Sequence, residues 1–535
     1  MPEGVMAALP GERASAGRIP PGLRNLVILL LLWEVVGHFG LVAQGALPSP
    51  TAILERLWID RADYPRHIEA TLIGSSLGFL FGNLIGVGAG IVFALSPRML
   101  RLFRGVNVAI FSLPAIAIAP ILTLTLTGME PRVVLATLGV YFVTMTATVV
   151  GISQADSRAT DMVRAYGGGR VKVLTMVQLR GALPSILSGF RIAAPNAVLG
   201  AILAEFGGGG DRWGLGVYLL GSLGQGMPTR LWGIGLVATA IAGLSYLAFA
   251  LIARRFVGAT RAVTLNAAVP GGDATDEPLA SRLLFAAGSL ALPFCFWWLF
   301  IWGTGAPWLI AKTPLGVADY LFFSPASASA QARLLHALGQ TLPVTGIGML
   351  VGLAFAFLLA ISSRLFPEAV RAFMPVALVT QTMPLVALTP LLVLILGRGT
   401  SLTLWVTISV TFFPAFVTLA QGLALVPRSA VELPRAYGAG VWREMRMVTI
   451  PASLPYLFAA TRLTVPRALL GVMIAEWLAT GTGLGNLLNQ SRGYLDYGMI
   501  WTVAAVAVLV SAACYQIVVL AERRVLRRLG MRTAE

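Results

Sequence analysis

The stretch RAYGGGRVKVLTMVQLRGALPSILSGFRIAAPNAVLGAILAEF, residues 164–206, occurs a second time in this chain as RAYGAGVWREMRMVTIPASLPYLFAATRLTVPRALLGVMIAEW, residues 435–477. The copies are offset by 271 residues, need no gap, and share 16 identical residues over 43 positions. Each copy begins with a polar, Arg-rich segment containing glycine and runs through a Leu-Pro pair into an apolar helix. This pattern is typical of a polar loop followed by a membrane span. The sequence therefore predicts two related halves.

The composition is that of a membrane protein. Apolar residues make up 57% of the chain and charged residues 12%, against roughly 45–50% and about 25% in soluble domains. A net charge of +16 would suggest nucleic acid as the partner of a soluble chain. In a membrane protein the position of the positive charges matters more than their sum. We therefore predict an all-α polytopic membrane protein that contacts the lipid bilayer and no nucleic acid.

Twelve apolar runs in the sequence are long enough to cross a bilayer, whose hydrocarbon core is about 30 Å thick. The first run could also be a signal peptide, but Glu34 and His38 interrupt it and many spans follow, which favours an uncleaved helix. The predicted spans, six in each half, are 26–43, 68–95, 105–127, 133–153, 184–206, 231–252, 283–303, 337–361, 373–396, 402–420, 455–478 and 499–521.

The distribution of Lys and Arg predicts the orientation of the chain. With the N-terminus inside, 26 of the 39 Lys and Arg residues fall in segments on the cytosolic side. Cytosolic segments of membrane proteins carry the excess of positive charge. This arrangement places both repeated loops and both chain termini in the cytosol.

A polar, Gly- and Pro-rich segment between the halves predicts a flexible cytosolic linker. The expected organisation is a cytosolic tail (1–24), a first half (25–256), the linker (257–282) and a second half (283–535). Six spans before the linker make the halves parallel repeats. Such repeats are related by an axis along the membrane normal, so we expect the substrate pathway to lie between them.

Small residues recur every fourth position in the second span of each half, which predicts close packing against another helix. These residues are Gly74, Gly78, Gly82, Gly86 and Gly90, with Gly348, Gly352, Ala356 and Ala360 in the second half.

The third spans also match, because Pro114 and Pro120 recur as Pro384 and Pro390. Proline removes backbone hydrogen bonds and kinks helices. Two interpretations stay open: the prolines only shape these helices, or the kinked helices border the substrate pathway.

The repeated loops resemble the EAA motif in permease subunits of bacterial ABC importers, in which an acidic residue precedes a glycine by six positions and a Leu-Pro follows. Asp161 and Glu432 take the acidic place before Gly167 and Gly438. The proline pairs and the Gly-Leu-Gly after Ala-Glu are similar to permeases of the nitrate/sulfonate/taurine branch. The resemblance implies two permease halves with the type I importer fold, fused in one chain of the bacterial cytoplasmic (inner) membrane.

The family resemblance also implies partners. In such importers the motif loop forms a short coupling helix that sits on a separate ATP-binding subunit, and an external binding protein delivers the substrate. We therefore expect two ATP-binding subunits. The alanines of the motif are replaced in both copies, so the geometry of the two loops is expected to differ. The coupling residues carried over are Asp161, Arg164, Ala165 and Gly167, with Glu432, Arg435, Ala436 and Gly438.

The sequence excludes ATP hydrolysis by this chain. A P-loop requires the pattern G-x-x-x-x-G-K-[ST], whereas Lys172 and Lys312 are the only lysines and neither follows a glycine. Cys295 and Cys514 lie in apolar runs without metal-ligand spacing. No catalytic residue, metal or cofactor is expected.

Arg467 is the main candidate for contact with substrate. It lies 12 residues after Pro455, about 18 Å along a helix, and a charge at that depth is costly and usually functional. A guanidinium also matches oxyanions, so an anionic solute is our hypothesis. A structural ion pair, or a side chain that reaches toward the cytosol, is the alternative. Further pathway candidates are Asn196, the counterpart of Arg467, together with Glu205, Glu476, Pro114 and Pro384.

Two other classes of protein are considered. A secondary transporter with parallel repeats would need intramembrane carboxylates, for which Glu34, Glu205 and Glu476 are candidates. A membrane enzyme would need clustered His, Cys or acidic residues near one membrane face, and the sequence has no such cluster.

Overall fold

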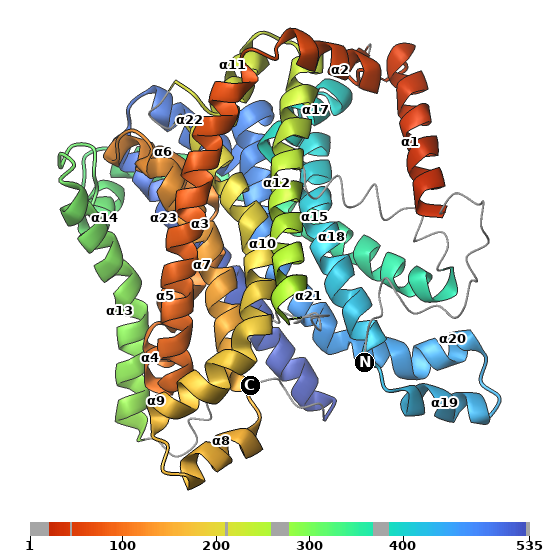
Figure 1. Ribbon diagram of the computed structural model, residues 1–535. Helices are drawn as coiled ribbons and strands as arrows, with labels where there is room; N and C mark the ends of the chain where they lie inside the picture. The colour runs from red at the N-terminus through yellow and green to blue at the C-terminus, as the bar shows by residue number, and fades with distance from the viewer. Residues whose placement is uncertain (1–20, 43–44, 209–211, 258–277, 367–384, 531–535) are drawn as a thin grey trace.

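The computed structural model describes residues 21–42, 45–208, 212–257, 278–366 and 385–530. Throughout these ranges the chain forms helices joined by turns and short loops, and no strand occurs in them. The long helices run roughly side by side (Figure 1). The prediction of an all-helical membrane protein is confirmed.

The first half contains both long helices and short connecting ones. They are α1 (Pro21–His38), α2 (Pro50–Ile59), α3 (Tyr64–Leu95), α4 (Pro97–Leu102), α5 (Arg104–Ser112), α6 (Ala115–Thr125), α7 (Glu130–Ser153), α8 (Ser157–Ala165), α9 (Arg170–Val173), the π-helical η2 (Leu174–Gln178), α10 (Leu179–Phe206), α11 (Leu215–Gly224) and α12 (Pro228–Val257).

The second half repeats this order. Its elements are α13 (Leu279–Thr304), α14 (Pro314–Phe322), α15 (Ser327–Leu365), α17 (Leu385–Leu396), α18 (Thr400–Ala424), α19 (Arg428–Ala436), α20 (Val441–Glu444), the π-helical η3 (Met445–Thr449), α21 (Ile450–Ala475), the π-helical η4 (Glu476–Thr480), α22 (Gly483–Gly493) and α23 (Tyr497–Arg528). Most of the predicted linker lies outside the described residues, and α13 begins at Leu279, inside its predicted end.

Nine helices in the described part of the chain are long and apolar enough to cross a membrane, and α5 with α6 would make a tenth. The predicted first span corresponds to α1, whose apolar part, Val27–His38, is shorter than the others. The predicted span 373–396 lies partly outside the described residues, and α17 is its described part. Twelve spans are therefore not reached within the described ranges.

The prediction of one kinked helix over 105–127 was wrong. The chain forms two helices, α5 and α6, bent by 98° from each other. The break falls at Leu113 and Pro114, both in the extended region of the Ramachandran plot, with Pro114 immediately before α6. A residue before proline is pushed out of the helical conformation by its contact with the proline ring. Pro120 remains inside α6, while Pro384 lies outside the described residues.

The stripes of small residues pack as predicted. A Cβ on Gly82 would lie 2.6 Å from Val140 Cβ, and one on Gly90 would lie 2.5 Å from Thr148 Cβ, so α3 touches α7 along this face. In the second half a Cβ on Gly348 would lie 2.7 Å from Thr407 Cβ, which brings α15 equally close to α18. Side chains larger than glycine or alanine would push these helices apart.

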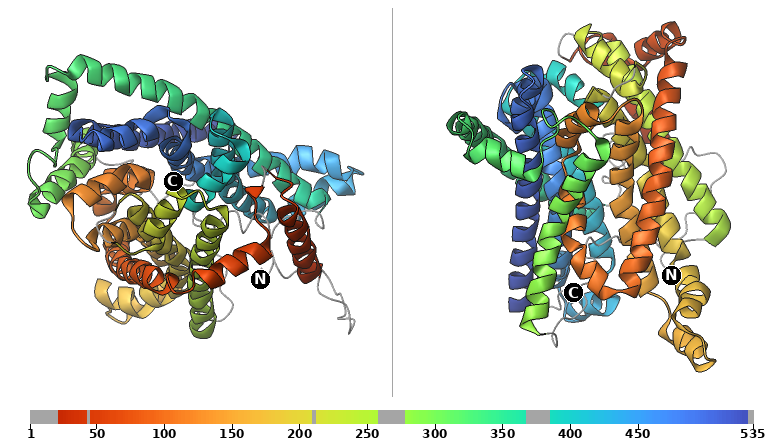
Figure 2. Two further views of the ribbon diagram at one scale, coloured as in Figure 1. Left: turned by 90° about the horizontal axis from the view of Figure 1, so that it is seen from above. Right: turned by 90° about the vertical axis from the view of Figure 1, so that its left-hand side faces the viewer.

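The two halves are packed together rather than merely linked. Helix α23 of the second half contacts α5 and α6 of the first, α12 contacts α17, and α13 lies against α4 and α5 (Figure 2). The largest apolar cluster draws side chains from both halves, among them Ile202, Phe206, Met473 and Ile474. We call it the shared cluster. It includes residues of α11 and α22 and of the first turns of α12 and α23.

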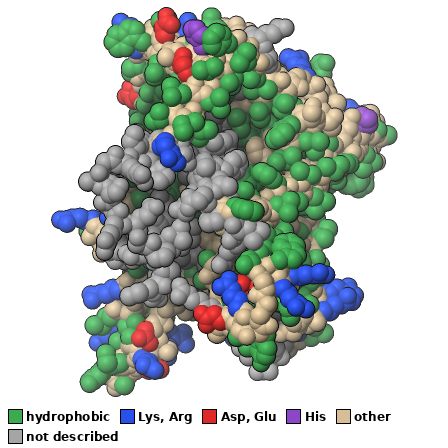
Figure 3. Space-filling model, turned by 90° about the vertical axis from the view of Figure 1, so that its right-hand side faces the viewer, with side chains coloured by type: hydrophobic (Ala, Val, Ile, Leu, Met, Phe, Trp, Pro, Cys, Tyr) green, Lys and Arg blue, Asp and Glu red, His purple; other side chains and the backbone are tan. Residues whose placement is uncertain are grey.

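Apolar and basic side chains occupy different parts of the surface. On the face that Figure 3 shows, hydrophobic side chains cover much of the described middle, and most of the visible Lys and Arg lie in the lower part. The lower part is where α8, α19 and the end of α23 lie in Figure 1. We call it the α8/α19 end, and the opposite one the α2/α11 end.

Candidate functional site

Helices α8 and α19 project from the same end of the molecule (Figure 1). Each has nine residues, is strongly amphipathic and contains two arginines and one acidic residue. The predicted coupling residues Asp161, Arg164, Glu432 and Arg435 are all exposed. The structure thus presents two equivalent exposed segments, one from each half.

The turns that follow these helices have the same backbone geometry. Gly167 has a φ of 77° and Gly438 a φ of 79°, so both lie in the left-handed region. Glycine adopts this conformation at little cost because it has no Cβ. The Gly167 N–H donates to the carbonyl of Arg164, and the Gly438 N–H donates to that of Arg435, both at 2.9 Å. At the two glycines, the backbone therefore does not show the difference that was expected between the loops.

The side chains around the loops do differ. Arg164 lies 3.6 Å from Asp161 within α8, and both side chains are well exposed. Arg435 instead forms a 2.6 Å ion pair with Glu444 of α20, whose side chain is 7% exposed. The position equivalent to Glu444 in the first copy is Val173. The second loop therefore has a brace between two helices, whereas the ion pair of the first stays within one helix.

Apolar residues on these loops were missed by sequence reasoning. Tyr166 and Tyr437 are each 87% exposed, and Met162 and Leu433 are 60% and 62% exposed. Burial of such side chains normally stabilises a protein, yet these four large apolar groups lie exposed at equivalent places on the two loops. The signal was available, because Tyr166 and Tyr437 belong to the RAYG repeated in both copies.

Glu205 and Glu476 occupy equivalent buried positions. The Glu205 carboxylate accepts hydrogen bonds from the Thr71 hydroxyl at 2.9 and 3.0 Å and from the Gly216 N–H at 2.8 Å. Glu476 accepts the same bonds from Thr341 at 2.8 and 3.0 Å and from Gly485 at 2.9 Å. Each carboxylate thus joins the end of a long helix to the start of α11 or α22. A carboxylate at a helix N-terminus also interacts favourably with the helix dipole.

Glu34, the third candidate for ion coupling, makes a similar contact. Its carboxylate accepts a hydrogen bond from the Thr51 hydroxyl at 2.5 Å and one from the Thr51 N–H at 3.1 Å, at the start of α2. The three carboxylates therefore hold helix starts in place. These contacts give each carboxylate a structural role that does not require ion coupling.

Sequence reasoning did not foresee the buried arginine Arg132. Its side chain is fully buried in α7, its Nε lies 3.7 Å from Glu205 Oε1, and it donates a hydrogen bond to the Trp213 carbonyl. The residue 270 positions later is Leu402, so the two halves differ in charge beside otherwise similar carboxylates.

The repeated arginines Arg191 and Arg462 have local partners. Arg462 forms a 2.9 Å ion pair with Glu522 of α23, and both side chains are largely buried. Arg191 contacts Tyr246 of α12 through a hydrogen bond and lies over its ring. Both side chains join the fifth long helix of their half to the last.

Arg467 and Asn196 stand at equivalent places in α21 and α10. Arg467 is exposed although Pro466 and Ala468 beside it are buried, and Asn196 is partly buried. Among the described residues, none forms a hydrogen bond or ion pair with Arg467. The alternative of a structural ion pair thus has no support within the described ranges. They also contain no group of three or more His, Cys, Asp or Glu that could hold a metal.

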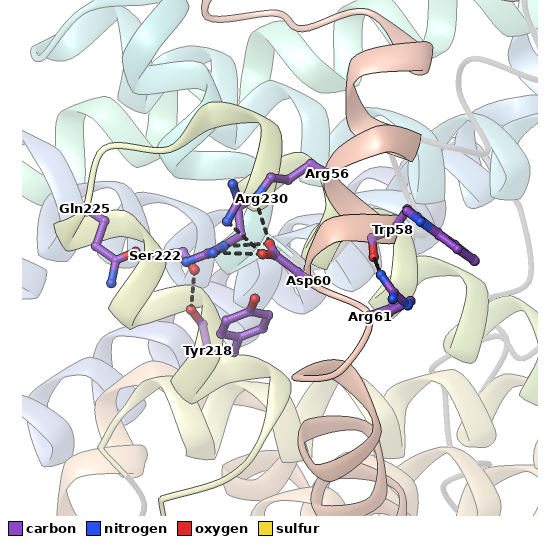
Figure 4. A network of polar contacts seen from close by, with 8 residues as sticks. All are labelled: Arg56, Trp58, Asp60, Arg61, Tyr218, Ser222, Gln225 and Arg230. Atoms are coloured by element: carbon purple, nitrogen blue, oxygen red, sulfur yellow. Dashed lines mark hydrogen bonds and ion pairs between the residues drawn. The ribbon is translucent and has the colours of Figure 1, made fainter.

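A separate polar network lies at the α2/α11 end (Figure 4). Arg56 and Arg230 each donate two hydrogen bonds, of 2.7–2.9 Å, to the carboxylate of Asp60. Arg230 also donates to Gln225 at 2.9 Å. The network joins α2 to α11 and α12. Burial alone would raise the pKa of Asp60, but the hydrogen bonds from Arg230 and Arg56 outweigh it and the pKa is lowered.

We predict that Asp60→Asn destabilises the protein by about 1–3 kcal/mol, because two guanidinium groups lose a charged acceptor. Since the pKa of Asp60 is lowered on folding, the stabilisation is present above the ordinary aspartate pKa of about 3.9 and is lost as the pH falls through the lowered value. The melting temperature in detergent should therefore be lower than that of the wild type at pH 7, and the difference should shrink below about pH 3.9.

Asp63→Asn is the matched control, because Asp63 is exposed and its side chain makes no cap hydrogen bond to α3. It should melt like the wild type. Equal melting of the Asp60 variant and the wild type at pH 7 would contradict the assignment.

Comparison with known proteins places these features in context. The family model described as "Binding-protein-dependent transport system inner membrane component" matches the chain twice, over residues 82–261 and 333–530. A riboflavin transport system permease of Chloroflexus aurantiacus is 32% identical over 157 residues, which are 29% of this chain and 59% of that protein. The match thus spans less than two thirds of that relative's length.

Two further relatives match over more of their own length. An ABC transporter permease of Haemophilus influenzae is 26% identical over 231 residues, which are 43% of this chain and 94% of that protein. An aliphatic sulfonates transport permease of Bacillus subtilis is 26% identical over 249 residues, which are 44% of this chain and 89% of that protein. Each relative therefore corresponds to less than half of this chain, as two fused permease halves require.

Proposed function

Because this chain belongs to the family of binding-protein-dependent transport system inner membrane components, we propose that it forms the complete membrane part of an importer driven by separate ATP-binding subunits. The two family matches, one in each half, support a single chain that supplies both permease units. The solute crosses the membrane between the halves.

The observation that carries the proposal is the pair of exposed helices α8 and α19. They lie at the same end of the molecule (Figure 1), turn at equivalent glycines, and expose Tyr166 and Tyr437 to the same extent. Each presents one docking surface to one ATP-binding subunit. Asp161, Arg164, Ala165 and Gly167 form the first surface with Tyr166, and Glu432, Arg435, Ala436 and Gly438 form the second with Tyr437.

The α8/α19 end is then the cytosolic end. The Arg-rich last turns of α12 and α23 lie toward the same end, in agreement with the excess of positive charge in cytosolic segments. The α2/α11 end faces outward and receives the external binding protein. ATP hydrolysis belongs to the partner, because neither Lys172 nor Lys312 follows a glycine as a P-loop requires.

We expect the solubilised complex to contain one copy of this chain and two ATP-binding subunits. Native mass spectrometry of the complex, purified through a tag on this chain, measures the stoichiometry directly. Two copies of this chain in the complex, or the absence of any ATP-binding subunit, would refute the proposal. Dependence of uptake on an ion gradient, with no effect of ATP, would favour a secondary transporter instead.

A further inference from the structure

Arg467 is the one exposed residue in α21 and η4. The residues on either side of it, Pro466 and Ala468, are buried. A charged residue within a span costs about 2.5–3.5 kcal/mol on insertion scales and is retained where it meets water or another charge. Arg467 is therefore accessible at a point where the rest of the helix is enclosed.

The helix position of Arg467 shows which way this surface faces. Leu470 and Ile474 follow it by three and seven residues, so all three lie on one face of a helix with about 3.6 residues per turn. Ile474 belongs to the shared cluster and Leu470 packs against it. Arg467 therefore faces the boundary between the halves and not the lipid.

Arg467 also lies at the edge of the shared cluster. The residues of α21 and η4 in that cluster begin at Leu469 and end at Trp477, toward the α2/α11 end. The apolar cluster closes the boundary on that side, and Arg467 comes directly before it. The guanidinium thus lies on the α8/α19 side of this cluster.

Other arginines within the spans are occupied. Arg132 has Glu205 and the Trp213 carbonyl, and Arg462 has Glu522. Arg467 has no hydrogen bond or ion pair with any of the described residues. The described part of the chain therefore leaves the five N–H groups of Arg467 available to a ligand.

The equivalent face of α10 carries no charge. Asn196 is followed seven residues later by Leu203, which belongs to the shared cluster. Of these two equivalent positions, one thus carries a cation and the other a neutral amide. A ligand there would meet one fixed positive charge, which suits a single anionic group.

We propose that Arg467 binds the anionic group of the transported solute, a sulfonate or a carboxylate, and that Asn196 lines the same site from the other half. This inference rests on the proposed function as an importer. A sulfonate offers three oxygens and a carboxylate two, and guanidinium N–H groups bind such oxygens in pairs. One relative, from Bacillus subtilis, is named as an aliphatic sulfonates transport permease.

The test is a binding titration of the purified chain in detergent, with methanesulfonate as the probe and dimethyl sulfone as its neutral isostere. Thermal unfolding is followed at constant ionic strength and chloride concentration. Methanesulfonate should raise the melting temperature of the wild type, and dimethyl sulfone should not. Arg467→Gln should weaken methanesulfonate binding roughly 10- to 100-fold, the range expected for a charge-assisted hydrogen bond.

Two variants separate this role from general effects of charge and folding. Arg467→Lys keeps the positive charge and should retain part of the binding. Arg98→Gln removes one exposed charge from α4 and should bind like the wild type. Each variant must melt near the wild-type temperature without ligand. If Arg467→Gln does not, the role of Arg467 is judged from the affinity of Arg467→Lys for the two probes.

Several outcomes would overturn the inference: no shift of the wild type by methanesulfonate, equal shifts by both probes, or full binding by Arg467→Gln. Co-purification of the ATP-binding subunit is measured on the same preparations. If the wild-type chain purifies without an ATP-binding subunit, the proposed importer is overturned. If the subunit co-purifies but the titration fails, only the anion site is overturned.

Discussion

Replacing Tyr166 and Tyr437 together by serine should weaken binding of each ATP-binding subunit at least about 30-fold, since buried aromatic anchors at interfaces are often worth 2 kcal/mol or more each. Both side chains are 87% exposed in the isolated chain and stand on the turns after α8 and α19. They contribute little to the stability of the chain itself. The melting temperature should therefore remain close to the wild-type value.

The measurement is the amount of ATP-binding subunit retained when the tagged chain is purified from membranes. Tyr494→Ser is the matched control, because Tyr494 is 83% exposed at the end of α22, away from the loops. This control should retain the subunit. Full retention by the double variant would show that the tyrosines are not part of the docking surface, whatever its effect on uptake.

The single variants test whether the two loops are equivalent. The Arg435–Glu444 pair braces the second loop, whereas Arg164 pairs within α8. A braced loop loses less conformational freedom on binding. We therefore expect Tyr437→Ser to reduce retention more than Tyr166→Ser, because the pre-organised loop contributes more of the binding free energy.

The second large effect is expected from Gly216→Ala and Gly485→Ala, each of which should destabilise the protein by about 3 kcal/mol or more through overpacking. A Cβ on Gly216 would overlap the Ile202 carbonyl, and one on Gly485 would overlap the Met473 carbonyl. Backbone atoms cannot rotate away as side chains do. The start of α11 or α22 would have to move and release the hydrogen bond to Glu205 or Glu476.

Each variant has a control in its own helix. Gly221 in α11 and Gly493 in α22 have open space where a Cβ would stand. Gly221→Ala and Gly493→Ala should leave stability unchanged or raise it by up to about 1 kcal/mol, because alanine favours helix over glycine. Thermal unfolding in detergent compares the pairs. If Gly216→Ala and Gly485→Ala melted like these controls, the tight contact would have no energetic weight.

Much of the architecture could be predicted from the sequence. The repeat at an offset of 271 residues predicted the two halves, and the spacing of small residues predicted close packing of one face of α3, although not that α7 is the partner. The polar loops were predicted from the same repeat, which includes Gly167 and Gly438. These features rest on local periodicity, on composition and on backbone preference, all of which can be read along the chain.

The predictions that failed concern the arrangement of neighbouring segments. The break between α5 and α6 was expected as a kink, although a proline signals only that the helix is disturbed and not by how much. The two turns were expected to differ, yet their glycines share the same φ and the same hydrogen bond to an arginine carbonyl. The geometry of a short turn is set by its glycine and its first hydrogen bonds, so replacement of neighbouring side chains leaves it unchanged.

By itself the sequence determined the class, the duplication, the segments exposed as loops and the identity of the charged residues within spans. It did not determine the roles of those charges, because each role depends on atoms far away in the chain. Thr71 and Glu205 are 134 positions apart, yet their side chains touch. The packing of α3, α10 and α11 surrounds Glu205 with hydrogen-bond donors. The packing of the two halves, in contrast, leaves Arg467 exposed. A charge buried in protein needs its partners from several elements at once, and their arrangement exists only in the tertiary structure.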